Sequence, residues 1–211
     1  MPHIYKFLLL LIATIVFSAC GPNNKTQAPE PGIYEQIHNH LTNLQTYRAM
    51  ATVEYISNRG TSTYETIQHG RITGEYRIEI TGPEHVAGNI TSLDGRHIYQ
   101  FNTRINGRVT ILARETQERS EIFLTAFIRN WQNSPESSVT VANLGEGQYT
   151  VLEAKISGNH PYLATQKLWV NNETLLPAKM IIFDLSGTER VIVNYHNFEY
   201  NIELDNALFT V

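Results

Sequence analysis

Apolar and polar residues alternate with a period of two along most of the chain, and this pattern constrains the fold more than any other feature. From Tyr47 to Tyr55 every second residue is apolar. Asn58-Arg59-Gly60 then supplies a turn into a second extended segment, 61–72, so the two segments predict a long β-hairpin. Because successive strand residues point to opposite faces, such alternation predicts a sheet with one buried face.

Short turns separate the further segments of this kind, which predicts an antiparallel meander. The expected strands after the hairpin are 76–81, 88–92, 97–102, 108–112, 138–142, 148–156, 163–170, 178–183 and 190–200. Together with the hairpin they make about ten or eleven strands. Strands that follow one another through short turns favour one large antiparallel sheet with helices packed on a single face, a mainly β member of the α+β class.

Three segments depart from the strand pattern. Residues 33–47 carry apolar side chains at helical spacing, which predicts an amphipathic helix: Ile33, Ile37, Leu41 and Leu44. Residues 117–131 also place their apolar side chains on one helical face and predict a second helix that interrupts the sheet: Ile122, Phe123, Ala126, Phe127 and Trp131. Residues 204–209 are expected to add a short terminal helix or strand.

The last long strand, 190–200, has apolar residues on both of its faces if alternation is strict. One face would carry Val191, Val193 and Tyr195. The other would carry Ile192, His196, Phe198 and Tyr200. A sheet that buries only one face has a cleaner pattern, so the second face is expected to need a cover from helices, a ligand or a partner.

An apolar run from Phe7 to Phe17 leads into Ser18-Ala19-Cys20, and Cys20 is the only cysteine of the 211 residues. The run is shorter than the roughly 20 residues that cross a bilayer, so a cleaved signal is favoured over a membrane-spanning helix. The motif resembles the lipobox of bacterial lipoproteins, with Phe17 where leucine is usual. This resemblance implies that residues 1–19 are a signal peptide and that Cys20 is acylated.

Several expectations follow from an acylated Cys20. The protein is exported to the cell envelope and anchored to a membrane by its acyl chains, and it has no thiol left for disulfides. Residues 20–31, which contain three prolines and no large apolar side chain after Cys20, are expected to form a flexible tether. Residues 32–211 are expected to form one domain. Gly21 is not aspartate, the residue that retains enterobacterial lipoproteins at the inner membrane, so an outer-membrane location is permitted.

The charge balance of the mature chain argues against one class of partner. Removing Lys6 from the 16 basic residues leaves 15 against 20 acidic ones, a net charge of −5. Such a chain is not expected to use nucleic acid or anionic headgroups as its main partner.

No motif for catalysis, metal binding or cofactor binding is complete in this sequence. It contains no zinc-protease helix motif, no phosphate-binding glycine loop and no Gly-x-Ser-x-Gly turn. The carboxylates that could hydrolyse cell wall lie on expected strand faces and in turns: Glu65, Glu79, Glu84, Asp94, Asp184 and Glu189. We therefore expect no catalytic residue, no metal site and no cofactor, and a wall hydrolase is a minor alternative.

Large apolar and aromatic side chains occur on nearly every expected strand, which predicts a wide core. An incompletely filled core of this kind is a ligand groove. The groove candidates are Tyr55, Tyr76, Ile78, Tyr99, Phe123, Phe127, Trp131, Trp169, Phe183 and Phe198. The alternative, that these side chains only fill the core, stays open.

Several segments, in their order and spacing, resemble the LolA/LolB-like lipoprotein-carrier superfamily. They are Gly74–Pro83, Asn89–Phe101, Lys167–Asn171 with Leu176–Met180, and Phe198–Asn201 with Leu204–Phe209. The resemblance extends over about residues 33–211. It implies an unclosed, curved half-barrel of about eleven antiparallel strands, with helices over an apolar cavity that can hold acyl chains.

The lipobox makes this chain similar to the anchored members of that superfamily and unlike its soluble carrier. Those members include LolB, lipid-binding lipoproteins of mycobacteria and GerS-like germination lipoproteins of spore formers. The leading hypothesis is an envelope lipoprotein whose groove binds a lipid or lipoprotein acyl chain. The GerS-like members imply an alternative, a protein-binding module that docks a cell-wall or spore-cortex amidase.

Overall fold

The computed structural model describes residues 32–113, 120–134, 137–145, 147–158 and 160–210. These residues belong to one compact unit, Pro31–Val211. The signal segment, Cys20 and the tether expected over residues 1–31 lie outside the described residues. Among the helices of the described part, none combines the length and the apolar character that a membrane span requires.

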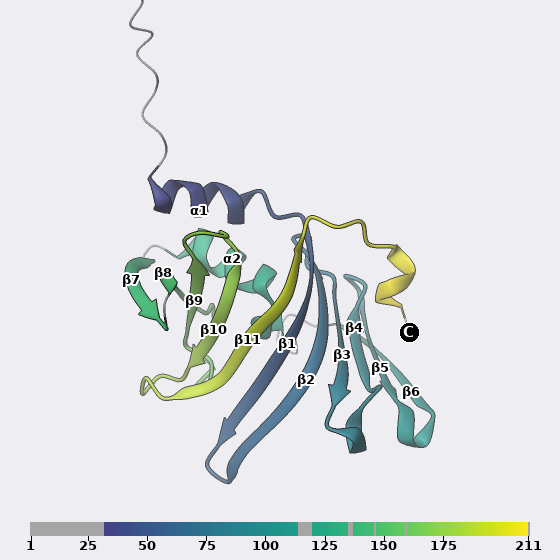
Figure 1. The fold of residues 1–211 in the computed structure, drawn as a ribbon. Coiled ribbons are helices and arrows are strands. Elements are labelled where there is room, and N and C mark those ends of the chain that lie inside the picture. The colour runs from purple at the N-terminus through teal and green to yellow at the C-terminus, as the bar shows by residue number, and fades with distance from the viewer. Residues whose placement is uncertain (1–31, 114–119, 135–136, 146, 159, 211) are drawn as a thin grey trace, which may run out of the picture. The chain divides into compact units, whose positions relative to one another are not determined.

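Eleven strands form one antiparallel sheet (Figure 1). Their bounds in chain order are β1 Thr46–Ser57, β2 Gly60–Arg71, β3 Tyr76–Gly82, β4 Ile90–Leu93, β5 His97–Asn102, β6 Gly107–Leu112, β7 Ser138–Leu144, β8 Gly147–Lys155, β9 Thr165–Asn171, β10 Pro177–Phe183 and β11 Glu189–Tyr200. The predicted antiparallel sheet is therefore confirmed, with strand boundaries that shift by a few residues. At β4, for example, the strand begins at Ile90, because Gly88, with φ of 80°, is still part of the preceding turn.

The first and last strands pair with each other, although they lie at opposite ends of the sequence. Tyr47 of β1 is opposite Tyr200 of β11, and Val53 is opposite Val193. This pairing joins two meanders, β1–β6 and β7–β11, into a single sheet whose free edges are β6 and β7. Because the edges do not pair with each other, the sheet is not closed into a barrel.

Within the described residues, two α-helices and four short 3-10 helices accompany the sheet. They are α1 Ile33–Thr42, α2 Leu124–Asn133, η1 Glu84–Val86, η2 Thr103–Ile105, η3 Ser120–Ile122 and η4 Asn206–Phe209. The first predicted helix ends earlier than expected, because β1 begins at Thr46. The second is divided, because Phe123 has extended backbone angles (φ −94°, ψ 141°) between η3 and α2. Residues 117–119 of that prediction lie outside the described part of the chain. The terminal segment forms the helix η4.

The hydrophobic core lies on the face of the sheet that α1 and α2 cover, here called the core face. Ile37 of α1, Phe127 of α2 and Leu168 of β9 are among its fully buried members. Helix α2 contacts both β8 and β2, although four strands separate these two in the sheet. The sheet therefore curves around α2, and the core face is its concave face.

The expectation that β11 presents apolar residues on both faces along its length is wrong for its second half. A bulge at Asn197, which has a left-handed φ of 44°, breaks the register with β1. The extra residue reverses the alternation that follows it. Phe198 therefore stacks on Tyr47, and the Tyr200 hydroxyl donates a hydrogen bond of 2.6 Å to the carbonyl of His40 in α1. Asparagine suits the site because it tolerates left-handed backbone better than most residues.

Candidate functional site

A pocket of about 730 Å³ opens on the core face at one end of the strands. Its walls come from the turn between β1 and β2, from η3, from the loop before β9 and from the start of β11. The lining residues are Tyr55, Ile56, Ser57, Asn58, Arg59, Glu121, Ile122, His160, Tyr162, Leu163, Ile182, Arg190 and Val191. Because alternate turns of an antiparallel meander lie at the same end of the sheet, segments far apart in sequence meet here. We call this end the open end; it is at the bottom of Figure 1.

A second pocket, of about 400 Å³, lies on the core face of β1 to β4. Its lining residues are Val53, Tyr55, Ser62, Tyr64, Thr66, Tyr76, Ile78, Ile80, Val86, Asn89, Thr91, Ile122 and Phe123. No lining residue that the structure describes carries a formal charge. The walls are therefore aliphatic and aromatic, with hydroxyl and amide groups between them.

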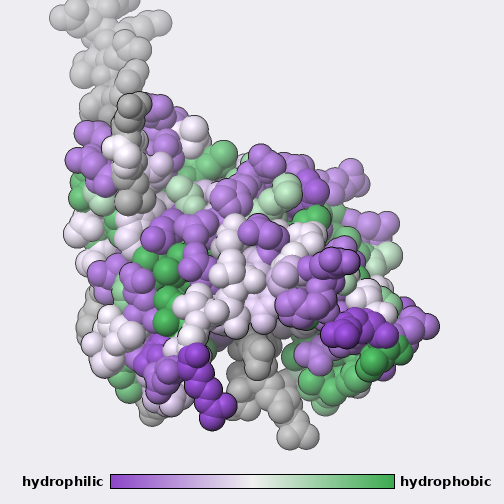
Figure 2. All heavy atoms as spheres, turned by 60° about the horizontal axis from the view of Figure 1, so that its bottom comes forward, coloured by the Kyte–Doolittle hydropathy of each residue, from purple (hydrophilic) through white to green (hydrophobic). Residues whose placement is uncertain are grey.

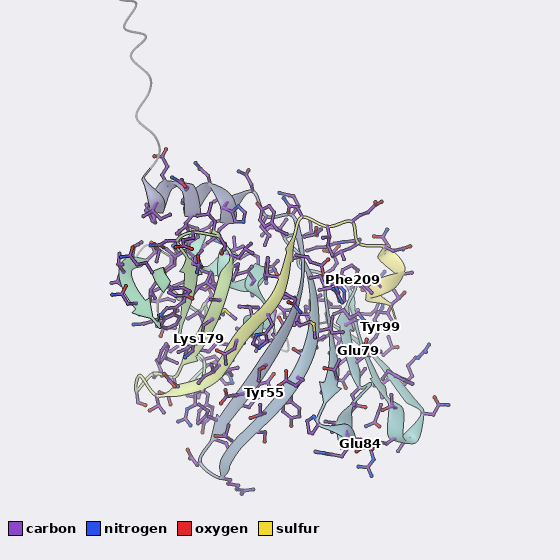
Figure 3. All side chains as sticks on the ribbon, viewed as in Figure 1. Tyr55, Glu79, Glu84, Tyr99, Lys179 and Phe209 are labelled. Carbon is purple, nitrogen blue, oxygen red and sulfur yellow. The ribbon has the colours of Figure 1, made fainter. Side chains whose placement is uncertain are left out.

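The two pockets share Tyr55 and Ile122, and together they form what we call the groove. Figure 3 shows Tyr55 on β1 toward the open end. Each pocket has a volume within the range of about 300–1,000 Å³ that is usual for sites of small molecules. The larger pocket brings the charged residues, and the smaller one is neutral, so the groove changes in polarity along its length.

The break between η3 and α2 builds the wall where the pockets meet. Phe123, which is almost fully buried, stacks on Tyr76 with 4.3 Å between ring centroids and 25° between planes. Gln166 of β9 holds this wall to the sheet. Its Nε2 donates to the carbonyl of Glu121 (2.6 Å), and its Oε1 accepts from Asn130 Nδ2 (2.8 Å). A buried glutamine thus ties both helical segments to the core face.

The start of α2 is also tied to the sheet by a buried tyrosine. Phe123, the N-cap residue of α2, makes no side-chain hydrogen bond to the first turn of the helix. Instead, the backbone N–H of Leu124 donates to the Tyr47 hydroxyl (3.3 Å), which in turn donates to Gln68 Oε1 (3.3 Å). Burial raises the pKa of Tyr47 above its usual value. The phenol therefore stays neutral and keeps its proton for this bond.

One ion pair at the open end joins Asp184 and Arg190. Asp184 accepts hydrogen bonds from Ser186, from the backbone of Thr188 and from Arg190, whose Nε and Nη2 lie 2.7 and 2.6 Å from Oδ2. These bonds, with that of the Ser186 hydroxyl foremost, hold the pKa of Asp184 well below its usual value. Arg59 is exposed and forms no ion pair with a described residue. The mouth of the groove therefore carries little net charge.

The groove is better suited to burying an apolar molecule than to catalysing a reaction. Within the described ranges, no three His, Cys, Asp or Glu side chains gather closely enough to hold a metal ion. The neutral pocket and its buried aromatic wall suit the exclusion of water from a hydrocarbon chain.

Comparison with known proteins assigns the chain to a family. A family model described as sporulation protein YdcC-like matches residues 3–209. The chain belongs to the YdcC-like sporulation protein family. No curated protein matches the sequence of this family member.

The unclosed sheet with its helices is the architecture that the LolA-type resemblance predicts for this YdcC-like chain. An uncharacterised conserved protein of Thermus thermophilus has a similar fold, with a TM-score of 0.53, 13% identity, and coverage of 85% of this chain and 94% of that one. The structure of the CwlD amidase from Clostridioides difficile in complex with the GerS lipoprotein matches with a TM-score of 0.49, 29% identity and coverage of 80% and 94%. A LolA superfamily protein of Nitrosomonas europaea matches with a TM-score of 0.47, 14% identity and coverage of 85% and 96%.

The groove candidates predicted from the sequence occupy three places in the YdcC-like domain. Those that line the groove are Tyr55, Tyr76, Ile78 and Phe123. Those that belong to the core or pack against it without lining the groove are Phe127, Trp131 and Phe198. Those on the opposite face of the sheet, as the strand register shows, are Tyr99, Trp169 and Phe183.

The three residues on the opposite face have polar neighbours there. The Tyr99 hydroxyl donates to Asp94 (2.8 Å), and the Trp169 ring lies 5.8 Å from Lys179 Nζ. Large aromatic side chains alone do not reveal which face a strand turns to the core.

Sequence reasoning did not single out several residues that line the groove. Val53 lies two residues before Tyr55 on β1, and Ile80 lies two residues after Ile78 on β3. Their positions on the same strand faces were the available signal. The polar members of the lining, such as Ser62 and Asn89, carried no comparable signal, because strands commonly expose such side chains.

Proposed function

We propose that this YdcC-like protein is an envelope lipoprotein, anchored to a membrane through acylated Cys20, whose groove binds an acyl chain of a lipid or lipoprotein. The observation that carries the proposal is the uncharged pocket of about 400 Å³ next to the larger pocket, with which it shares Tyr55 and Ile122. An apolar chain could enter the larger pocket at the open end and be buried away from water in the smaller one.

Burial supplies the binding energy without a catalytic residue. Each methylene group removed from water contributes about 0.8 kcal/mol. Eight such groups would therefore contribute about 6 kcal/mol before the costs of ordering the chain. The hydroxyl and amide groups of Ser62, Tyr64 and Asn89 in the lining can meet a polar ester or amide of the ligand. The proposed role is non-enzymatic and uses no cofactor.

The lipobox and the family support the proposed location. Cys20 follows an apolar segment of signal-peptide length, and the family model begins at residue 3 and so includes this segment. The protein is then extracytoplasmic, in the cell envelope, and the description of its family links it to sporulation. Gly21 leaves an outer-membrane location open where that membrane exists.

Uptake of a fluorescent fatty acid by the purified protein, together with native mass spectrometry without detergent, tests the proposal. We expect saturable uptake and a co-purifying lipid. Ile78→Trp, which fills the neutral pocket, should lower the affinity at least about tenfold, since a ligand that loses about two methylene contacts loses about 1.6 kcal/mol. Ile192→Trp is the matched control, because Ile192 is a half-buried isoleucine on the opposite face of the sheet. Absence of uptake by the unmodified protein would refute the proposal.

A second candidate is a protein-docking function, and the exposed edge strand β6 favours it. Val109, Ile111 and Leu112 are all exposed on this strand, and a free edge can accept a strand from a partner. A cell-wall or spore-cortex amidase is the partner class that suits a sporulation family. Pull-down from envelope extracts of sporulating cells separates the two candidates, because docking predicts one stoichiometric protein partner and indifference to fatty acid.

A further inference from the structure

The structure points to a second interaction surface at the open end: we propose that the turns around the groove mouth dock onto a lipid bilayer. The surface consists of the described residues of five turns at the same end of the sheet, namely 58–59, 83–89, 103–106, 156–158 with 160–164, and 184–188. Their positions follow from the antiparallel topology. This docking is independent of whether the groove holds a ligand.

The two most exposed large apolar side chains of the described residues lie on these turns. Ile105 in η2 is 77% exposed, and Leu185 between β10 and β11 is 76% exposed. Tyr162, in the loop before β9, is 55% exposed and lines the larger pocket. Single exposed apolar residues are ordinary on protein surfaces. The position of Ile105, Leu185 and Tyr162 at the end of the sheet where the larger pocket opens favours a functional role for this end.

The charges of the two ends differ in the direction that membrane docking requires. At the opposite end, the turns 43–45, 72–75, 94–96, 172–176 and 201–205 hold five acidic residues and one basic residue among those described: Glu75, Asp94, Glu173, Glu203, Asp205 and Arg96. The described turns of the open end hold two acids and two bases: Glu84, Asp184, Arg59 and Arg104. Asp184 is further neutralised by Arg190. An anionic bilayer therefore repels one end of the domain and tolerates the other.

The form of this surface favours a bilayer over a protein partner. Ile105 and Leu185 sit on separate turns and have small neighbours, Asn106-Gly107 and Ser186-Gly187. Figure 2 brings the open end forward and shows hydrophobic residues in separate groups among polar ones. A stable protein interface needs a continuous packed area of about 800 Å² per partner. A bilayer interface can take up isolated side chains, because acyl chains and headgroups rearrange around each one.

Flotation with phosphatidylcholine–phosphatidylglycerol vesicles tests the proposal. The protein is the mature chain from residue 20 with Cys20→Ser, so that no acyl anchor contributes; all members of the core cluster lie beyond residue 32. We expect this chain to float with vesicles. The double variant Ile105→Ser/Leu185→Ser should lower the partition coefficient about tenfold. Val141→Ser is the matched control, because Val141 is 68% exposed but lies on the edge strand β7.

The outcomes separate this proposal from that of the groove. Equal flotation of the double variant and the unmodified chain, or an equal loss in Val141→Ser, would overturn bilayer docking. Absence of flotation together with capture of a protein partner through the same turns would do so as well. Fatty-acid uptake measured without vesicles should be the same in the double variant and the unmodified chain. If uptake fails while flotation persists, the groove proposal falls and the docking surface stands.

Discussion

Two buried glutamines on the core face differ in how fully their side-chain amides are hydrogen-bonded, so replacing them should affect the stability of the protein to different extents. Gln166 and Gln68 are both 0% exposed. Both nitrogen and oxygen of the Gln166 amide have partners, at 2.6 and 2.8 Å. The Gln68 amide has one long bond of 3.3 Å, to Tyr47, and its Nε2 has no partner among the described residues. The same substitution to leucine should therefore have different costs at the two sites.

Gln166→Leu removes two bonds that attach η3 and α2 to the sheet. At about 1–1.5 kcal/mol for each bond, it should lower the free energy of unfolding by about 2–3 kcal/mol and the Tm by about 5–10 °C. Gln68→Leu removes one weak bond and one unpaired buried donor, so its effect should be within about 1 kcal/mol of zero. Urea unfolding followed by tryptophan fluorescence measures both variants. A Gln166→Leu loss below about 1 kcal/mol, or an equal loss in Gln68→Leu, would refute the reasoning.

Two further predictions concern packing and pH. Gly70→Ala should destabilise the protein by about 2–3 kcal/mol, because the new Cβ would lie 2.4 Å from Cε1 of the buried Tyr47 ring. Gly82→Ala is the control and should be near neutral, because its Cβ would lie at an ordinary contact distance of 3.4 Å from its neighbours. Equal urea midpoints for the two variants would contradict this prediction. Burial, reinforced by two neighbouring arginines, lowers the pKa of His69 from 6.5 to about 4, so between these values the unfolded chain binds the proton and stability should fall as the pH falls. The urea midpoint of the His69→Gln variant should depend less on pH in this window than that of the unmodified protein. If both midpoints change with pH in parallel, His69 is excluded as a source of the pH dependence of stability.

The local elements could be predicted well because their signals are local. Period-two alternation predicted the strands, and Asn58-Arg59-Gly60 predicted the first turn, which the structure places between β1 and β2. Helical spacing predicted α1 and most of α2. The extended residue Phe123 between η3 and α2 could not be predicted, since its side chain fits the helical pattern as well as its neighbours do. In the structure its ring stacks on Tyr76 of β3, a strand that is distant in the sequence.

The lining of the groove was only partly predictable, because the register of the strands determines on which face of the sheet each side chain lies. Tyr55 and Ile78 were among the candidates and line the groove, whereas Trp169 and Phe183 face the other way. A bulge of one residue at Asn197 was enough to move Phe198 to the core face. A one-residue change in register moves every following side chain to the other face of the sheet. No local sequence pattern indicates where such a change occurs.

The sequence by itself determined the strand and turn pattern, the two helical segments and the apolar N-terminal segment that ends at Cys20. Each of these depends on residues close together in the chain, where propensity and spacing act directly. Only the tertiary structure decided that β1 pairs with β11, that Gln166 holds the wall of the groove, and that Ile105 and Leu185 are exposed at the same end of the sheet. Those features join residues far apart in sequence, and only the curvature and register of the complete sheet bring them together.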